Sequence, residues 1–246
     1  MSMTITVLTV RQFLRSRSIF VVLGISLLAA ILAGIVQAVP DENSIRDLRS
    51  IFSGLYLNLF SGTLLPLATL VLATAALGDE IEDRTLQYLA LKPVSRLQIV
   101  FEKLLAVVAV LIPLTWFGIV VTWAITAFGN VDELRDLLWP ALASSLVAII
   151  GFGSLFMLLS LFVQRALLIG VFYVFVWEST LSQFLPGIRA ISIRHYTQSL
   201  FTRLLDDPRI SVDGPSGEST VVITIVALLV ICTALATWRL QRMSLE

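Results

Sequence analysis

Few side chains of this protein could carry out chemistry by themselves. The 246 residues include one histidine, His195, and one cysteine, Cys232, and only one carboxylate, that of Glu178, falls inside a long apolar run. An intramembrane hydrolase requires several converging His, Asp or Ser groups, so this inventory argues against that class of enzyme. One cysteine supports neither a disulfide framework nor a cysteine-based metal site, and the lone histidine is most simply a surface residue. We expect no catalytic and no metal-binding residue.

The sequence also lacks the motif that binds the phosphates of ATP. A Walker loop has the pattern Gly-x-x-x-x-Gly-Lys-Ser/Thr, because backbone amides and a lysine must surround the phosphates. The two lysines, Lys92 and Lys103, both follow residues other than glycine. Any ATP-driven work must therefore begin on another chain, where ATP and magnesium would bind, and we expect no cofactor on this one.

Glu178 lies in the apolar segment VFYVFVWEST. A buried carboxylate costs about 2.5–3.5 kcal/mol near the bilayer centre, whereas each Leu, Ile, Val or Phe returns about 0.3–0.6 kcal/mol. Eight such residues between Leu167 and Val176 offset the glutamate, so the helix can insert. Its position about two turns before Pro186 predicts the outer half of a span. Two interpretations stay open: a cargo, proton or inter-helix hydrogen-bonding contact, and an interfacial glutamate that reaches outer water.

The second long apolar run carries a polar stripe. Asn58, Ser61 and Thr63 fall within a segment that is otherwise apolar. The stripe could face a translocation path, and packing between helices explains it equally well. We take Asn58, together with Glu178, as the candidate contacts of a substrate or proton pathway.

The composition predicts a membrane protein. Hydrophobic residues make up 57% of the chain and charged residues 14%, with a formal net charge of zero. About 20 apolar residues cross a hydrocarbon core of about 30 Å, and long runs without alternating polar positions favour helices over a closed barrel. We expect an all-α integral membrane protein whose residues 1–246 form one domain, with six spans at about 18–39, 51–78, 104–128, 137–163, 167–186 and 219–238.

The distribution of Lys and Arg predicts the orientation. With the N-terminus inside, ten of these residues lie in inner segments and seven in outer ones, and the first four loops with the N-terminus give eight against three. Positive residues favour the cytoplasmic side, and early segments usually dominate. We therefore expect a multi-pass protein of the plasma (inner) membrane with both termini cytoplasmic.

Two segments outside the spans have the spacing of amphipathic helices. The first lies before the first span and predicts an interfacial helix, although a basic flank that only sets orientation is the alternative. The second follows the fifth span and predicts a short outer-surface helix, with a solvated loop as the alternative. Their apolar stripes are Met3, Val7, Val10 and Leu14 in the first and Ile193, Tyr196, Leu200 and Leu204 in the second.

A charged segment from Gly78 to Lys103 separates the second and third spans. The acidic residues that follow Gly78 favour a new helix start, and Pro93 predicts its end. Ser95 and Gln98 have the spacing of a capping box, which predicts that the third long helix begins there. The face of the short helix would be formed by Ile81, Thr85, Tyr88 and Leu89. We expect a short cytoplasmic helix that docks on a soluble partner, with a solvated loop as the alternative.

This segment resembles the inner loop of ABC-2 type transporter permeases. The shared pattern is acidic-x-acidic, then x-T-L, a hydrophobic pair, P-V-S-R and a later lysine. It occurs here as Glu80, Glu82, Thr85, Leu86, Leu89, Pro93, Val94, Ser95, Arg96 and Lys103. Many members have Gly before the Thr, where this chain has Arg84. The segment from Arg11 to Phe20 is similar to the basic entry helix of such permeases, and Trp177-Glu178 fits their frequent aromatic–Glu pair.

The resemblance implies the membrane half of an ATP-driven transporter, paired with a second permease subunit and two cytoplasmic ABC ATPase subunits. A module that converts ATPase motion into signalling or envelope-protein maturation, without bulk transport, is the alternative. We expect contact with membrane lipid and none with nucleic acid. The residues expected to couple to the ATPase are Glu80, Glu82, Thr85, Leu86, Tyr88, Leu89, Pro93 and Arg96.

Overall fold

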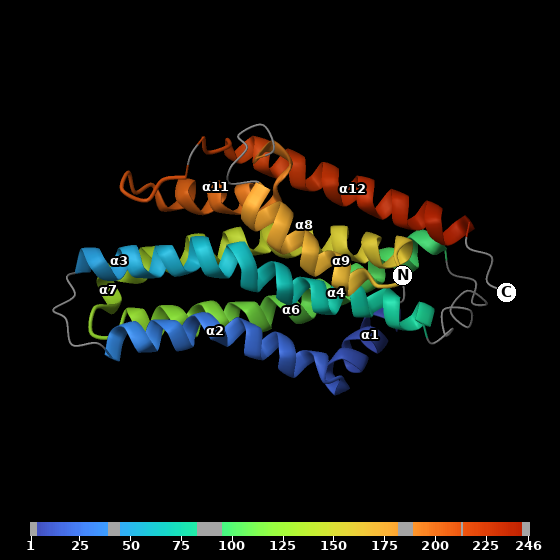
Figure 1. Ribbon diagram of the computed structural model, residues 1–246, viewed down its shortest axis with the longest axis horizontal. Helices are drawn as coiled ribbons and strands as arrows, with labels where there is room; N and C mark the ends of the chain where they lie inside the picture. Colours follow the sequence, from blue (N-terminus) through green and yellow to red (C-terminus); the bar gives the residue numbers. More distant parts are fainter. Residues whose placement is uncertain (1–3, 39–44, 83–94, 182–188, 213, 243–246) are drawn as a thin grey trace.

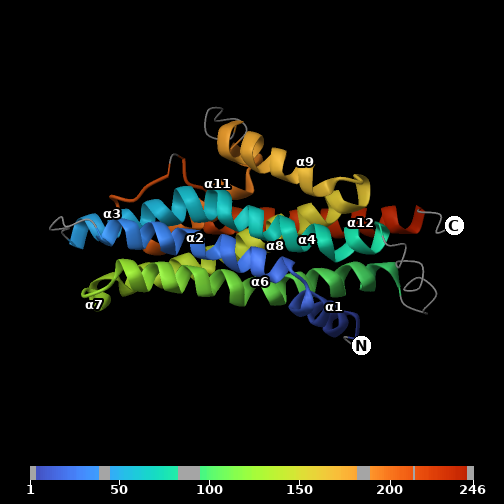
Figure 2. The same ribbon diagram turned by 60° about the horizontal axis from the view of Figure 1, so that its bottom comes forward.

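The computed structural model describes residues 4–38, 45–82, 95–181, 189–212 and 214–242, and these residues form helices and short connections without any strand. Most of the long helices run roughly side by side (Figures 1 and 2). In chain order the helices are α1 (Thr4–Arg15), α2 (Ser18–Ala38), α3 (Ile45–Gly54), η1 (Leu55–Leu64), α4 (Leu65–Glu82), α6 (Arg96–Thr126), α7 (Val131–Leu134), η2 (Arg135–Leu137), α8 (Leu138–Phe162), α9 (Ala166–Phe172), η3 (Tyr173–Leu181), η4 (Arg189–Ile191), α11 (Ile193–Leu205) and α12 (Glu218–Arg242).

The bundle has two ends, which we name by the residues found there. The start of α1, the end of α4, the start of α6 and the end of α12 lie at one end, called the terminal end (Figure 1). The start of α3, all of α7 and the last turn of α11 lie at the other, called the distal end. The start of α1 and the end of α12 thus lie at the same end of the bundle.

Five helical stretches among the described residues are long and apolar enough to cross a membrane. Their bounds are Ser18–Ala38, Asp47–Gly78, Arg96–Thr126, Val131–Phe162 and Glu218–Arg242, which correspond to five of the six predicted spans. Of the stretch predicted at 167–186, the structure describes an apolar helix over Ala166–Thr180, and residues 182–188 lie outside the described residues. At 1.5 Å per residue this described helix is about 22 Å long, against a hydrocarbon core of about 30 Å.

The α9–η3 stretch and α11 together form a broken crossing. Figure 1 shows α9 and η3 in the half of the bundle nearer the terminal end, whereas α11 continues toward the distal end. The helix predicted after the fifth apolar segment is present as α11, but it is more deeply buried than a helix on the outer surface: Thr197 and Ser199 are buried as well as Ile193 and Tyr196 of the predicted stripe, and the helix packs on α8, α12 and η1. Of the predicted stripe only Leu204, near the distal end, is exposed.

Two segments, η1 and η3, are π-helical, so each is wider than an α-helix. In η1 the widening has a local cause, because Pro66 follows directly. A proline ring clashes with the carbonyl four residues earlier in an α-helix and cannot donate a backbone hydrogen bond. The backbone N–H of Leu65 instead bonds to the carbonyl of Phe60, five residues back. Single π-helical turns of this kind are frequent at functional sites.

Helices α2 and α6 approach each other closely, backbone to backbone. A Cβ atom added at Gly118 of α6 would lie 2.4 Å from the carbonyl oxygen of Ser26 on α2. The facing side of α2 is built from small residues, Ala29, Ala30 and Ala33, which are buried. Small residues allow two membrane helices to approach closely and gain van der Waals contact. Gly118 is thus required by packing rather than by backbone conformation.

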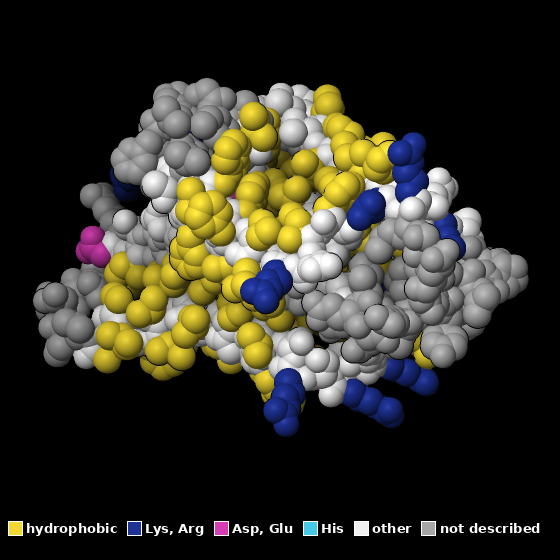
Figure 3. Space-filling model, turned by 45° about the vertical axis from the view of Figure 1, so that its right-hand side comes forward, with side chains coloured by type: hydrophobic (Ala, Val, Ile, Leu, Met, Phe, Trp, Pro, Cys, Tyr) yellow, Lys and Arg dark blue, Asp and Glu magenta, His cyan; other side chains and the backbone are white. Residues whose placement is uncertain are grey.

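The amphipathic helix predicted at the N-terminus is α1, which packs on α6. Ile5 and Phe13 are buried against the bundle, whereas Val7 and Leu14 of the predicted stripe are more than half exposed. Arg11 and Arg15 are exposed as well. Figure 3, which brings the terminal end forward, shows a broad apolar surface with Lys and Arg side chains along its margin. This distribution suits a helix whose outer face meets lipid and charged headgroups.

Candidate functional site

The structure describes only part of the segment predicted to contact an ATPase. Thr85, Leu86, Tyr88, Leu89 and Pro93 lie outside the described residues. The helix that precedes them, α4, can be compared with the prediction. The prediction of a new helix start after Gly78 is wrong, because α4 runs through this glycine to Glu82. A glycine inside a helix costs about 1 kcal/mol, too little to end a helix that tertiary packing stabilises. Glu80 and Glu82 therefore belong to the last turn of α4.

The helix after the segment begins where the sequence predicts. Ser95 is the N-cap of α6, and its hydroxyl accepts a hydrogen bond of 3.2 Å from the backbone N–H of Gln98. The Gln98 side chain does not close the expected capping box. It donates instead to the Glu102 carboxylate at 2.7 Å. Arg96 is the first residue of α6 and is half-buried.

Glu102 holds the start of α1. One of its carboxylate oxygens accepts hydrogen bonds from the backbone N–H groups of Ile5, at 3.0 Å, and Thr6, at 3.2 Å. The Thr6 hydroxyl donates in return to the Glu102 carbonyl at 3.2 Å. The first N–H groups of a helix have no partner within the helix, and the helix dipole favours a negative charge there. Glu102 thus acts as a cap supplied by another helix.

Lys103, the next residue, contacts α4 about two turns before the end of that helix. Its side chain is fully buried, and its ammonium nitrogen donates to the carbonyl of Ala76 at 2.5 Å. A backbone carbonyl thus binds a positive charge that burial removes from water. Lys103 is also the later lysine of the sequence pattern described above.

We call Glu102 and Lys103, with their contacts on α1 and α4, the charged clamp. Adjacent residues of a helix point in different directions, so α6 reaches α1 with one side chain and α4 with the other. The clamp lies about two turns after the start of α6. It therefore joins the two helices that flank residues 83–94 to the N-terminal helix.

Glu178 is buried and holds the start of α11. Its carboxylate accepts hydrogen bonds from the Ser192 hydroxyl at 2.5 Å, the backbone N–H of Ile193 at 3.1 Å, and the backbone N–H of Arg194 at 3.4 Å. The Tyr173 hydroxyl donates a fourth at 2.9 Å. The side chain is 0% exposed, so the expectation that it reaches outer water is wrong. Of the interpretations left open, the geometry is that of an inter-helix hydrogen-bonding group.

Polar groups of α11 also contact the π-helical segment η1. The Arg194 guanidinium packs on Gly62, where an added Cβ would lie 2.8 Å from its central carbon. The Gln198 side chain donates to the carbonyl of Leu57 at 2.6 Å. A π-helix alters the pairing of its carbonyls, so donors from a neighbouring helix can bind them. The missing side chain at Gly62 and the carbonyl of Leu57 in η1 thus allow α11 to pack inside the bundle.

The predicted polar stripe of the second span is divided between two environments. Asn58 is exposed, and its side-chain amide donates to the Gly54 carbonyl at 3.2 Å within its own helix. Ser61 is buried and donates to the Leu57 carbonyl. Among the described residues no hydrogen bond joins Asn58 to Glu178, so the structure does not bring these two candidate pathway residues together.

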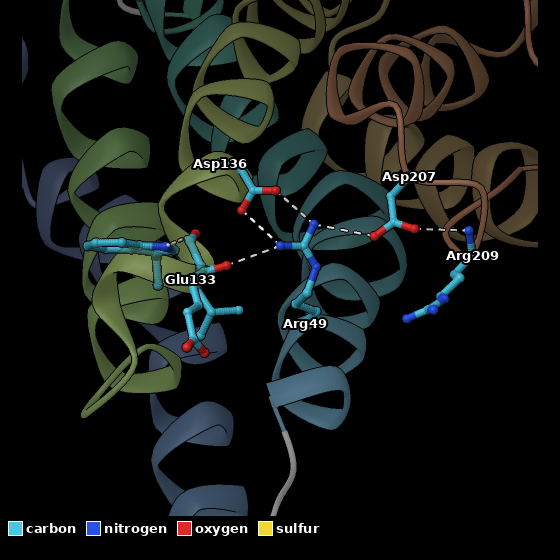
Figure 4. A network of polar contacts seen from close by, with 7 residues as sticks. Arg49, Glu133, Asp136, Asp207 and Arg209 are labelled. Carbon is cyan, nitrogen blue, oxygen red and sulfur yellow. Dashed lines mark hydrogen bonds and ion pairs between the residues drawn. The ribbon is translucent and has the colours of Figure 1, made fainter.

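At the distal end, Arg49 joins three connections (Figure 4). Its guanidinium donates to both carboxylate oxygens of Asp136, at 2.9 and 2.7 Å, to the carbonyl of Glu133 at 3.1 Å, and to Asp207 at 3.3 Å. Asp207 also accepts from the backbone N–H of Arg209 at 3.1 Å. The arginine lies on α3, whereas its partners lie on α7–η2 and after α11. A partly exposed pair contributes little energy, yet the bidentate geometry fixes how these parts meet.

Sequence reasoning missed the partners of these charges. Glu102 and Lys103 are adjacent residues of opposite charge at the start of an apolar run. Because adjacent residues of a helix point in different directions, such a pair indicates that each side chain has its own partner. Ser192 precedes His195 by three residues and accepts from its backbone N–H at 3.1 Å, so the N-cap of α11 was recognisable. Nothing local indicates that Glu178 is the second cap.

Five apolar helices, a broken crossing and an amphipathic N-terminal helix define a multi-pass integral membrane protein. A model of the family described as ABC-2 family transporter protein matches residues 12–185, which is more than half of the chain. The chain belongs to this family and is thus a transmembrane permease of the ABC transporter class, a transport component that works with ABC ATPase subunits. A search among curated proteins found no match.

Proposed function

We propose that this chain is the membrane-spanning subunit of an ATP-driven transporter that moves a substrate across or out of the membrane. Separate ATPase subunits bind ATP and Mg²⁺ and supply the energy. The observation that carries the proposal is the charged clamp, since Glu102 and Lys103 connect α1, α4 and α6 at the end of the bundle where α4 ends and α6 begins, the two helices that flank the proposed ATPase-contact segment in the sequence.

The proposed contact with the ATPase involves the end of α4, residues 83–94 and the start of α6. Tyr88 and Leu89 are its anchors, because a few buried aromatic and aliphatic side chains dominate the energy of such docking sites. The remaining contact residues are Glu80, Glu82, Thr85, Leu86, Pro93 and Arg96. Family membership and the position of the flanking helices at the terminal end support this assignment.

In this proposal, motion of the ATPase reaches the membrane helices because the helices that connect them are rigid. ATP-driven closure of the ATPase pushes the segment between α4 and α6, and α6 transmits the displacement because it is one continuous helix over Arg96–Thr126. Lys103 moves α4 with it, and Glu102 moves α1. Breaking a buried charged contact costs several kcal/mol, so the three helices shift together rather than separately.

The proposed orientation places the terminal end in the cytoplasm, with the protein in the plasma (inner) membrane. The excess of Lys and Arg in the corresponding sequence segments supports it. A second permease subunit, identical or related, completes the transporter. Asn58 is exposed on the surface of the single bundle, which supports a pathway that runs between two subunits.

In our proposal, Glu178 becomes part of the transport pathway when α11 moves away from its carboxylate. Its carboxylate is occupied by the start of α11 in the present arrangement. When the bundle rearranges and α11 withdraws, the carboxylate becomes available to a proton or to a cationic group of the cargo. The broken crossing supports such a role, since discontinuous membrane helices frequently surround transported ions and substrates.

The test is the ratio of transport to ATP hydrolysis in the purified complex, reconstituted in vesicles. Lys103→Met and Glu102→Gln should leave the ATPase bound and hydrolysing while transport per ATP falls about tenfold, because the clamp no longer joins the three helices. Asp132→Asn, an exposed change at the distal end, is the control and should keep the ratio. Full coupling in both clamp variants would refute the mechanism, and a chain that binds no ATPase would refute the proposed function.

A further inference from the structure

A pocket at the terminal end lies between α4, α8 and α9. Its volume is about 380 Å³, within the range of small-molecule sites, and the first residue of α2 also lines it. Its lining includes the apolar Val71, Ala75 and Leu168 and the polar Gln164 and Arg165.

The polar groups of the pocket differ in what they already bind. Thr74 and Ser160 donate to carbonyls of their own helices, at 2.7 and 2.8 Å. Gln164 and Arg165 are exposed, and their side chains make no hydrogen bond or ion pair with any part of the chain that the structure describes. The pocket therefore presents one fixed positive charge and one amide at its rim, and among the residues whose side chains the structure describes no carboxylate lines it.

The surroundings of the pocket are those of a membrane boundary. Leu167 and Leu168 of α9 are 46% and 61% exposed on the apolar surface of the bundle. Arg15 ends α1, Arg17 lies in the turn before α2, and Arg239 lies in the last turns of α12, and basic residues near a membrane surface attract anionic headgroups. An occupant must therefore be apolar where it meets Val71, Ala75 and Leu168, and anionic where it meets Arg165.

We propose that this pocket binds one anionic phospholipid. The phosphate contacts the Arg165 guanidinium and the Gln164 amide, and the first methylenes of an acyl chain lie along Val71, Ala75 and Leu168. A planar guanidinium binds a phosphate through two parallel hydrogen bonds, which gives the site its preference for an anionic head. The lipid bridges α4 and α9. Its leaflet is the cytoplasmic one if the proposed orientation holds, but binding itself depends on neither orientation nor the ATPase.

The experiment is native mass spectrometry of the purified full chain after delipidation, titrated with phosphatidylglycerol and, separately, with phosphatidylcholine. We expect one phosphatidylglycerol to be retained with about tenfold higher affinity than phosphatidylcholine. Arg165→Gln should abolish this preference. Arg15→Gln, an exposed arginine at the same end outside the pocket, is the matched control and should keep it. Equal binding of the two lipids, or equal loss in both arginine variants, would overturn the proposal.

Further measurements test whether a free phosphate or a second subunit, and not a phospholipid, occupies the pocket. Glycerol phosphate, the head without chains, should not compete, and competition at millimolar concentration would indicate a site for a free phosphate instead. Ala75→Leu fills the apolar wall and should weaken phosphatidylglycerol binding while the melting temperature of the protein is kept. A Leu168→Cys variant that cross-links to a second copy in the membrane would show that another subunit covers the pocket, which would also overturn the proposal.

Discussion

The hydroxyl of Ser192 donates a 2.5 Å hydrogen bond to the carboxylate of Glu178, fourteen residues earlier in the chain. The same carboxylate accepts from the first backbone N–H groups of α11, so a buried charge inside η3 caps the start of α11. A membrane interior gives these N–H groups no water, and each unpaired one would cost several kcal/mol. Glu178 is therefore a condition for α11 to lie inside the bundle.

Glu178→Gln should lower the stability of the purified protein by about 1–3 kcal/mol, because the amide removes the charge and can turn a donor toward groups that are themselves donors. Ser192→Ala, which removes one of the four hydrogen bonds, should lower it by about 1 kcal/mol. Thermal melting in detergent measures both. An unchanged melting temperature in Glu178→Gln would show that the carboxylate is not needed for α11.

Transport by the same two variants distinguishes a structural role of Glu178 from a role in the transport pathway. If Glu178 also contacts a proton or the cargo, transport per folded molecule should fall in Glu178→Gln, and its pH dependence should change. Ser192→Ala should then transport normally at the same folded amount. Equal transport in the two variants across pH would leave Glu178 with the capping role alone.

Tyr88→Ala combined with Leu89→Ala should weaken binding of the ATPase partner by a few kcal/mol, the usual effect of truncating interface anchors. The helices should still insert, since both residues lie outside the predicted spans. Co-purification of the ATPase and its stimulated hydrolysis should fall, while the amount of permease in the membrane is kept. Retention of the partner with full stimulation would exclude this segment as the coupling element and direct attention to α1.

Gly118→Val should destabilise the bundle by about 1–3 kcal/mol, because even the first added carbon would meet the carbonyl of Ser26 on α2. Gly24→Ala and Gly34→Ala are matched controls, since an added Cβ at either glycine meets nothing within 4 Å. In a helix these controls should be neutral or stabilising by up to about 1 kcal/mol. Membrane abundance and melting temperature are the measurements, and a tolerated valine would contradict the close approach of α2 and α6.

Orientation can be tested by cysteine labelling in sealed cells. The native Cys232 is buried, so its background labelling should be low. A membrane-impermeant reagent added outside should modify Asp213→Cys but not Gln87→Cys, because the charge pattern places residue 213 outside and residue 87 in the cytoplasm. Modification of Gln87→Cys would reverse the proposed orientation.

The sequence by itself determined the helices that cross the bundle. Five of the six predicted spans correspond to helices of sufficient length, because the number of consecutive apolar residues is set by the thickness of the hydrocarbon core. The start of α6 at Ser95 was predictable for a similar reason, since an N-cap depends on residues three positions apart. The family was predicted from the charged segment after Gly78, whose pattern also depends only on residues close together in the sequence.

Only the tertiary structure decided what the charges bind and how far the fifth apolar segment reaches. Glu102 contacts Ile5 across 97 residues of sequence, and Lys103 contacts Ala76 across 27. No periodicity encodes such pairs, because any buried carboxylate satisfies any helix start that the fold brings near it. The fifth segment is apolar, and Glu178 lies inside its helix η3, where the carboxylate pairs the first backbone N–H groups of α11, which would otherwise be buried without a partner.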